Sequence, residues 1–193
     1  MLTQLSTLKS RLSILDSDNT NDALLINAAK AVSTRFDAEC NRTLARTENT
    51  IYEFPAESVE ICCPCYPIEI IARFELKTSE AAGWVEQTGV QHLIRRRCVI
   101  SLGSPLGSFR GQGRVVYSGG YVLPGTAVGT GQTPLPADLE QAAVEQVAYW
   151  FQNRERLGLQ RIWDYHATYR QFADLDLLPG VRAVLASYKR LSI

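Results

Sequence analysis

The sequence predicts an α+β fold: a small α-helical bundle formed by both chain ends, with an inserted antiparallel β subdomain and a C-terminal arm. Two observations support this prediction. At both ends of the 193-residue chain, apolar residues recur at spacings of three and four, which is the period of an α-helix. Between the ends, from Ile51 to Val122, short runs of strand-forming residues are separated by Gly and Pro.

The N-terminal part predicts two helices. The first carries leucines at helical spacing from Leu2 to Leu15, with Lys9, Arg11 and serines between them. The polar segment Asp16–Thr20 is rich in residues that favour helix N-caps and separates the two helices. The second helix places Asp22 in its first turn and is expected to end near Arg42.

The best-defined element is a third helix that begins at Leu135-Pro136 and is expected to run to about Leu157. Pro136 suits the first helical position because that N–H group has no partner inside a helix. Asp138 and Glu140 add negative charge to the first turn, and apolar residues follow at a period near 3.6. Gly158 favours a helix end.

The organisation follows from these elements. We expect a helical body from residues 1–46 and 134–158, a β-rich subdomain over 47–123, a linker over 124–133, and an aromatic arm with a C-terminal helix over 159–193. Helices far apart in the sequence must then pack together to form one core. A bundle this small buries modest area, so its remaining apolar surface suits a second subunit.

Composition limits the function classes. Apolar residues make up 46% of the chain and the formal net charge is zero, which argues against a general nucleic-acid-binding protein. No apolar run approaches the ~20 residues of a membrane span. The start of the chain lacks the pattern of a secretory signal, and the five cysteines are read as reduced thiols in a cytoplasmic setting.

The candidates for chemistry are few. Cys62 and Cys65 satisfy the C-x-x-C pattern, but strands rather than a helix N-terminus flank them, so they are interpreted as structural. A zinc site would need two further ligands from Cys40, Cys98, His92 and His166, and none of these forms a second close pair. A thiol- or zinc-dependent protein using Cys62 and Cys65 stays open as an alternative.

The basic run Arg95-Arg96-Arg97 has two interpretations. The favoured one is a solvated turn between strands. The other is contact with an acidic partner or with nucleic acid. No acidic pair indicates acid–base chemistry, so we predict no enzymatic activity, no catalytic residue, no metal and no cofactor.

Several motifs together resemble the head–tail connector proteins (adaptor or head-completion proteins) of tailed bacteriophages, here with a large strand-rich insertion. The resemblance covers nearly the whole chain. It depends on the order of the motifs, since each motif alone is weak. These motifs are the Leu-rich opening helix, Asp22-Ala23-Leu24-Leu25, Cys40-Asn41-Arg42, Tyr66-Pro67-Ile68, Val116-Tyr117-Ser118-Gly119-Gly120-Tyr121, Leu135-Pro136-Ala137-Asp138-Leu139 with Ala142, Ala143 and Arg154, and Leu178-Pro179-Gly180-Val181 with Leu185 and Tyr188-Lys189-Arg190.

The resemblance implies a structural virion protein. Members of this kind form rings, typically of twelve copies, that dock on the portal protein once DNA is packaged. They lie in the neck of the virion, at the head–tail junction, and the virion is assembled in the host cytoplasm. The ring extends the DNA channel, lets DNA pass without sequence-specific binding, and receives the next neck or tail protein. A neck stopper or tail-completion protein is the nearest alternative.

The same resemblance assigns the C-terminal segment to the portal-facing or ring interface, and aromatic anchors suit the pockets of a partner. The expected interface residues are Trp163, Tyr165, Tyr169, Phe172, Leu178, Val181, Leu185 and Tyr188.

Overall fold

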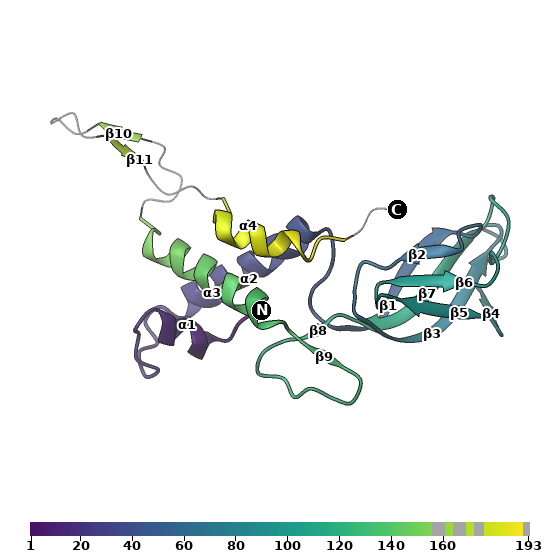
Figure 1. Cartoon of the computed structure of the whole chain (residues 1–193), viewed down its shortest axis with the longest axis horizontal. Coiled ribbons are helices and arrows are strands. Elements are labelled where there is room, and N and C mark those ends of the chain that lie inside the picture. Colours follow the sequence, from purple (N-terminus) through teal and green to yellow (C-terminus); the bar gives the residue numbers. More distant parts are fainter. Residues whose placement is uncertain (156–160, 164–168, 172–175, 191–193) are drawn as a thin grey trace. The chain divides into compact units, whose positions relative to one another are not determined.

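A computed structural model describes residues 1–155, 161–163, 169–171 and 176–190 (Figure 1). The predicted α+β class is confirmed, because the described residues form both helices and antiparallel sheets. The chain divides into two compact units. The helical unit comprises Met1–Glu39 and Leu135–Tyr188, and the β unit comprises Cys40–Pro134 and Lys189–Ile193.

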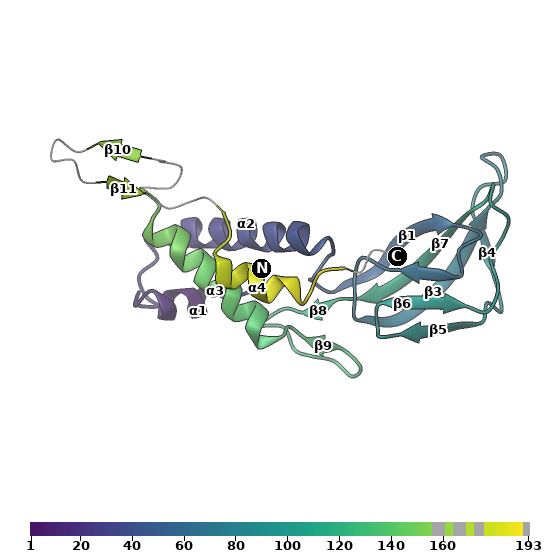
Figure 2. The same cartoon turned by 45° about the horizontal axis from the view of Figure 1, so that its top comes forward.

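The helices of the helical unit come from both ends of the sequence, as Figures 1 and 2 show. Their bounds are α1 Leu5–Arg11, α2 Asp22–Cys40, α3 Ala137–Gln152 and α4 Pro179–Ala186. A short antiparallel pair, β10 (Arg161–Trp163) and β11 (Tyr169–Gln171), lies between α3 and α4 in the sequence.

The core of the helical unit is built from one apolar stripe on each helix. On α2 the stripe follows helical spacing through Leu25, Val32 and Phe36, none of which is exposed. Helix α3 packs against α1 and α4. Val181 and Leu185 of α4 are four residues apart, so they lie on one face, and both are buried.

Two predicted helix ends differ from the structure. The leucine repeat predicts a first helix from Leu2 to Leu15, but α1 ends at Arg11, Ser13 has φ 57°, and Leu15 is exposed. The third helix ends at Gln152 rather than near Leu157. Asn153 follows the last turn with a non-helical ψ of 13°, and its side-chain amide donates to the carbonyl of Tyr149 at 2.9 Å.

The β unit contains two antiparallel sheets that form two layers (Figure 2). The four-stranded sheet has the order β1-β7-β3-β4 and the three-stranded sheet the order β2-β6-β5. The strands are β1 Thr47–Pro55, β2 Glu60–Cys62, β3 Ile68–Lys77, β4 Val85–Gln87, β5 His92–Arg95, β6 Val99–Leu102, β7 Gln112–Gly119, β8 Tyr121–Val122 and β9 Thr133–Pro134.

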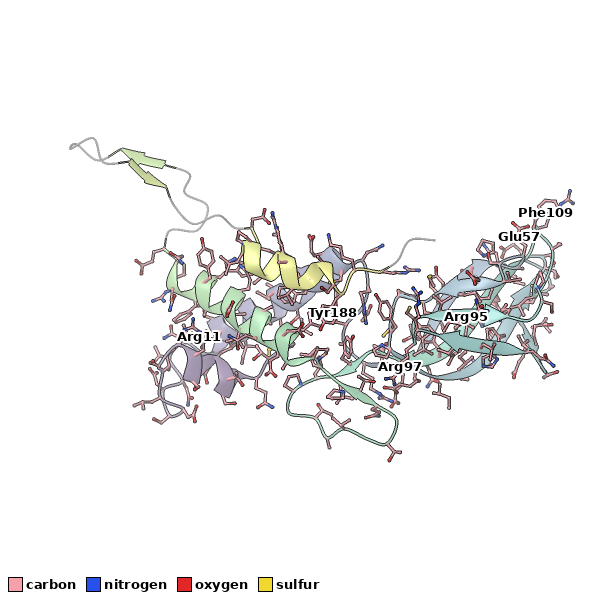
Figure 3. The ribbon with its side chains drawn as sticks, viewed as in Figure 1. Arg11, Glu57, Arg95, Arg97, Phe109 and Tyr188 are labelled. Atoms are coloured by element: carbon pink, nitrogen blue, oxygen red, sulfur yellow. The ribbon has the colours of Figure 1, made fainter. Side chains whose placement is uncertain are left out.

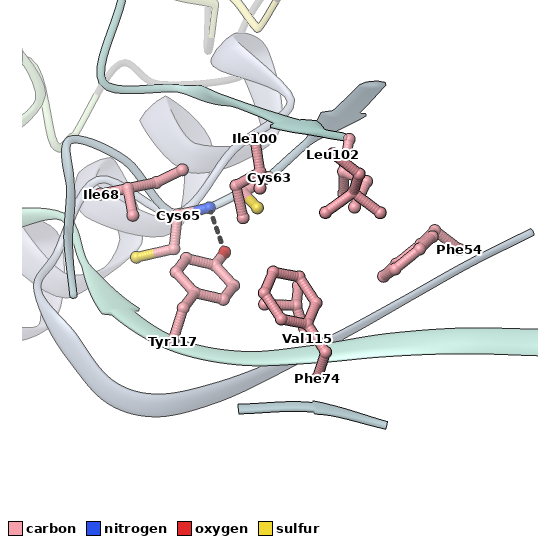
Figure 4. Packing of buried hydrophobic residues seen from close by; sticks show 10 residues of the cluster. Phe54, Cys63, Cys65, Ile68, Phe74, Ile100, Leu102, Val115 and Tyr117 are labelled. Carbon is pink, nitrogen blue, oxygen red and sulfur yellow. Dashed lines mark hydrogen bonds between the residues drawn. The ribbon is translucent and has the colours of Figure 1, made fainter. Parts of the chain in front are cut away.

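Side chains from both layers meet in the core of the β unit (Figure 4). Phe54, Phe74 and Val115 come from the four-stranded sheet, and Ile61 and Ile100 come from the three-stranded sheet. The alternation of Ile70, Ala72, Phe74 and Leu76 with Arg73 and Glu75 predicts that β3 has one apolar and one polar face. The structure differs, because Ile70 and Ala72 are exposed and Glu75 is buried. Register shifts between Ile68 and Ile70 and between Ile71 and Arg73 interrupt the alternation.

The sequence did not predict β5 or the short pair β8–β9. All four residues of β5 are exposed, so the strand lacks the buried alternating positions from which strands are recognised. β8 pairs in parallel with β9 at the end of the predicted linker, through Tyr121↔Thr133 and Val122↔Pro134. The order of short strands within the sheets was not predicted either.

Candidate interaction surfaces

The residues of the predicted interface fall into three groups. Tyr165 and Phe172 lie outside the described residues. Trp163 and Tyr169 lie on β10 and β11, where they are partners in the strand register. These four residues therefore stay a prediction.

The other predicted interface residues lie at and after the start of α4. Val181 and Leu185 are buried in the core of the helical unit, with 1% and 0% exposure, and their place in an interface stays a prediction. Leu178 and Tyr188 are half-buried. The hydroxyl of Tyr188 donates to the carboxylate of Asp138 in the first turn of α3, with an O–O distance of 2.7 Å to Oδ1.

The end of the chain is fixed to the β unit by Arg190. Its backbone N–H donates to the carbonyl of Cys40 at 2.9 Å. Its guanidinium donates to the hydroxyl of Tyr52 at 2.9 Å and to the carbonyl of Cys62, and it lies 5.3 Å from the centroid of the Tyr52 ring. These contacts give Arg190 a structural role within the β unit.

Three motifs that are distant in the sequence meet around Arg42. Its guanidinium carbon lies 3.2 Å from the ring centroid of Tyr66 and 5.3 Å from that of Tyr121, a cation–π arrangement on both rings. It also donates to the carbonyl of Tyr66. The N–H of Gly120 donates to the carbonyl of Pro67 at 3.0 Å. These short motifs therefore encode one packing site in the β unit.

The cysteines of Cys62-Cys63-Pro64-Cys65 are placed for packing rather than for nucleophilic chemistry. Burial raises the pKa of the Cys63 thiol to about 12 and also raises the pKa of Cys62. The thiol of Cys65 lies 3.1 Å from the carbonyl oxygen of Gly119, and the N–H of Cys65 donates to the hydroxyl of Tyr117 at 3.0 Å (Figure 4). A reactive thiol needs a lowered pKa, which is the opposite shift.

Native thiol reactivity tests this interpretation. Treatment with a disulfide reagent at about pH 8 should modify Cys40, Cys63 and Cys65 only slowly, because all three are buried and a thiol of pKa about 12 is about 10⁻⁴ ionised at that pH. The half-buried Cys62 and Cys98 should react first. In denaturant, all five cysteines of the chain should react at once. Fast native labelling of Cys63, located by peptide mass analysis, would contradict the assignment.

Other ionisable groups show no arrangement for catalysis among the described residues. His92 is exposed, with its ring 5.4 Å from that of Phe74, and His166 lies outside the described residues. Hydrogen bonds from Arg114 and Arg73 lower the pKa of the Glu75 carboxyl, so Glu75 is held as a structural ion pair. Within the described ranges no group of three metal-ligating side chains is found, and no helix is long and apolar enough to cross a membrane.

The turn between β5 and β6 carries the arginine run. Arg96 and Arg97 have φ of 48° and 57°, and the N–H of Cys98 donates to the carbonyl of Arg95 at 3.1 Å. Two successive residues of positive φ closed by this hydrogen bond are features of a type I′ turn, here within a three-residue loop between the paired Arg95 and Val99. Within the β unit, Figure 3 shows Arg97 near one end and Glu57 and Phe109 near the other. The sequence predicted a solvated turn here but not its left-handed conformation.

These observations define a class: a two-unit α+β protein with a helical unit closed by both chain ends and a two-layered β unit. No family model matches the chain, and comparison with curated proteins gives no match.

Solved structures do match it. One is a chain in the neck of an empty gene transfer agent particle computed with C6 symmetry, with a TM-score of 0.60 and 14% identity over 97% of this chain and 89% of that chain. Another is a chain in the virion of a native gene transfer agent particle, with a TM-score of 0.56, 14% identity and the same coverage. The fold is therefore shared over nearly the full length of both chains.

Proposed function

We propose that this protein is a structural component of the neck of a phage-like particle. The observation that carries the proposal is the fold similarity to a gene transfer agent neck chain, which spans 97% of this chain and 89% of that one. This coverage includes residues of both units, so the similarity is not limited to a common small domain. The thiols and carboxylates described above give no catalytic arrangement that would favour an enzyme.

Within the neck, the proposed role is that of a head-to-tail adaptor. Copies of the chain would assemble into a ring on the portal protein, extend the DNA channel and receive the next neck or tail protein. The motifs of the connector family support this role. Head-to-tail pairing of unlike surfaces closes into a ring when the rotation between neighbours allows it. Twelve copies is the number that the connector resemblance implies.

The proposed portal contact uses the aromatic residues between α3 and α4. Large aromatic side chains contribute much of the binding energy when a partner's pockets receive them. Substitution is a better test than deletion of the C-terminal region, because deletion would remove Leu177, Val181 and Leu185 from the core of the helical unit.

The test combines Trp163→Ala and Tyr169→Ala in the full-length chain. We expect portal affinity to fall by about 30-fold or more, which corresponds to about 2 kcal/mol, with little change in melting temperature. Phe109→Ala is the control, since Phe109 is 70% exposed on the β unit and outside this contact. Affinity is measured by surface plasmon resonance on immobilised portal.

One result would contradict the adaptor assignment, and another would contradict the choice of contact residues. If the wild-type chain does not bind portal but binds an isolated adaptor or tail-completion ring, the chain is a neck stopper or a tail-completion protein. If the double variant loses stability and affinity together, Trp163 and Tyr169 are core residues. Electron microscopy of assembled particles would then locate the protein.

A further inference from the structure

The Arg95–Arg97 turn has a sequence that does not suit its backbone. Both central residues of a type I′ turn have positive φ, and Asn-Gly is the preferred pair there. Arg96 and Arg97 occupy these positions with φ of 48° and 57°. A side chain with a Cβ costs about 1–2 kcal/mol in the left-handed region. The two arginines are therefore not explained by the stability of the turn.

The turn is held in place from both sheets of the β unit. The carbonyl of Arg97 accepts a 2.7 Å hydrogen bond from the N–H of Ile68, where β3 begins. The carbonyl of Cys98 accepts a 3.2 Å hydrogen bond from the N–H of Cys63, just after β2. The three guanidinium groups are consequently presented from a fixed base.

The charges of the turn are only partly neutralised within the chain. Arg95 lies 3.2 Å from the carboxylate of Glu60, measured from Nη1 to Oε1. For Arg96 and Arg97, both exposed, no described carboxylate lies within ion-pair distance. The whole β unit has eleven Lys and Arg against eight Glu and no Asp, a formal charge of +3 in a chain of zero net charge.

We infer that the Arg95–Arg97 turn contacts the phosphate backbone of duplex DNA without reading its sequence. This inference rests on the proposed function, in which DNA passes the neck. The planar guanidinium group forms paired hydrogen bonds with phosphate oxygens. Each phosphate neutralised on duplex DNA releases counterions, which makes such a contact favourable at low salt.

An acidic protein segment is the alternative occupant. Leu93 and Ile94 on β5 are 67% and 38% exposed and could adjoin such a segment. Exposed arginine–carboxylate pairs, however, contribute about 0–1 kcal/mol each. Binding to a polyanion accounts better for two arginines in an unfavourable backbone conformation, because each added positive charge raises the affinity for the polyanion.

The test uses a variant that improves the turn while it removes the charge. Arg96→Asn combined with Arg97→Gly supplies the preferred type I′ pair. The ¹⁵N-labelled full-length protein is titrated with a 20-bp DNA duplex at about 20 to 100 mM salt, conditions under which a phosphate contact is strong. The signals of the Arg95 side chain and of the Leu93 and Cys98 amides report binding at the turn.

For the wild type we expect these signals to shift and the affinity to fall as salt rises. For the Asn-Gly variant we expect a melting temperature equal to or above that of the wild type, and DNA binding weaker by about tenfold or more. The slope of log K against log salt should decrease by about 1.8, since two phosphate contacts are lost. Arg110→Gln is the matched control. Arg110 is an exposed arginine just before β7, at the end of that strand away from the Arg95–Arg97 turn, so its substitution should leave the slope unchanged.

Several results would overturn the inference: a wild-type protein without DNA-dependent shifts at the turn, a variant with unchanged affinity, or an effect of Arg110→Gln as large as that of the variant. If poly-L-glutamate shifts the turn signals and DNA does not, the turn binds an acidic protein partner.

The portal assay separates this inference from the proposed function. Portal binding by a chain that does not bind DNA would overturn the DNA contact alone, and DNA binding without portal binding would overturn the adaptor role alone.

Discussion

Alanine at Gly120 should lower the free energy of unfolding by more than about 4 kcal/mol, which is exceptional for a single substitution. Gly120 has φ of +101°, and a Cβ added there would lie 2.6 Å from the carbonyl oxygen of Ala45 and 2.8 Å from Cα of Arg46. Both are backbone atoms, so no side chain can move aside to make room.

The segment that would have to move is fixed by two hydrogen bonds to Tyr121, the residue after Gly120. The N–H of Tyr121 donates to the carbonyl of Leu44 at 2.8 Å, and the N–H of Arg46 donates to the carbonyl of Tyr121 at 2.8 Å. A shift of residues 44–46 would break these bonds and disturb the packing of Arg42 on Tyr121. The steric cost therefore adds to the cost of the left-handed backbone.

Urea unfolding followed by circular dichroism measures the effect. Gly89→Ala is the matched control, because Gly89 also has positive φ (+71°) but an added Cβ there would have no atom of the described part of the chain within 4 Å. It should cost only the backbone strain, about 1–2 kcal/mol. If Gly120→Ala and Gly89→Ala were equally destabilising, the close approach of Gly120 to residues 44–46 would be contradicted.

The Gly119-Gly120 pair illustrates what the sequence could show and what it could not. Two adjacent glycines after a strand predict a break in the chain, and the break is present. Their physical cause is a contact with residues 44–46 and with Pro67, which are far away in the sequence. Local propensity carries no information about such a close approach.

The helices were more predictable than the strands for a related reason. Residues four apart on α2, such as Leu25 and Ala29, share a face by helix geometry alone, so the apolar period indicates the core side. Strand β5 is exposed along its length and is defined by its hydrogen bonds to β6. Its partner cannot be read from the period of its own residues.

The same limit applied to the candidate surfaces. Apolar residues such as Val181 and Leu185 occur both in interfaces and in protein cores. Their burial in the core becomes visible only when α3 is seen to lie beside α4. For the Arg95–Arg97 turn, composition predicted exposure correctly. The positive φ of Arg96 and Arg97, which makes these arginines unusual, depends on the hairpin that β5 and β6 form.

The attachment of α4 depends on a buried polar residue of α3, and this gives the second large expected effect. Gln146 is 0% exposed. Its amide oxygen accepts a hydrogen bond from the N–H of Leu178 at 2.9 Å, and its amide nitrogen donates to the carbonyl of Asp176 at 3.4 Å. One side chain thus satisfies both a donor and an acceptor of the segment that leads into α4.

We expect Gln146→Leu to lower the free energy of unfolding by about 2–4 kcal/mol. Leucine has a similar size but leaves the partly buried Leu178 N–H and Asp176 carbonyl without this partner, and an unsatisfied group costs about 1–3 kcal/mol when it is buried. Gln141→Leu on the same helix is the control. Gln141 is exposed, and its hydrogen bond among the described residues is to Glu145 one turn away, so its substitution should change stability by less than about 0.5 kcal/mol.

Urea unfolding gives the two stabilities, and hydrogen exchange locates the change. In the Gln146 variant, amides of α4 such as those of Arg182 and Leu185 should exchange faster, while those of Val115 and Tyr117 in the β unit should not change. Equal effects of the two glutamine substitutions, or exchange that rises equally in both units, would show that α4 does not depend on Gln146. In that case the ion pairs of Asp176 with Arg35 and Arg182 would be the contacts that hold the segment before α4.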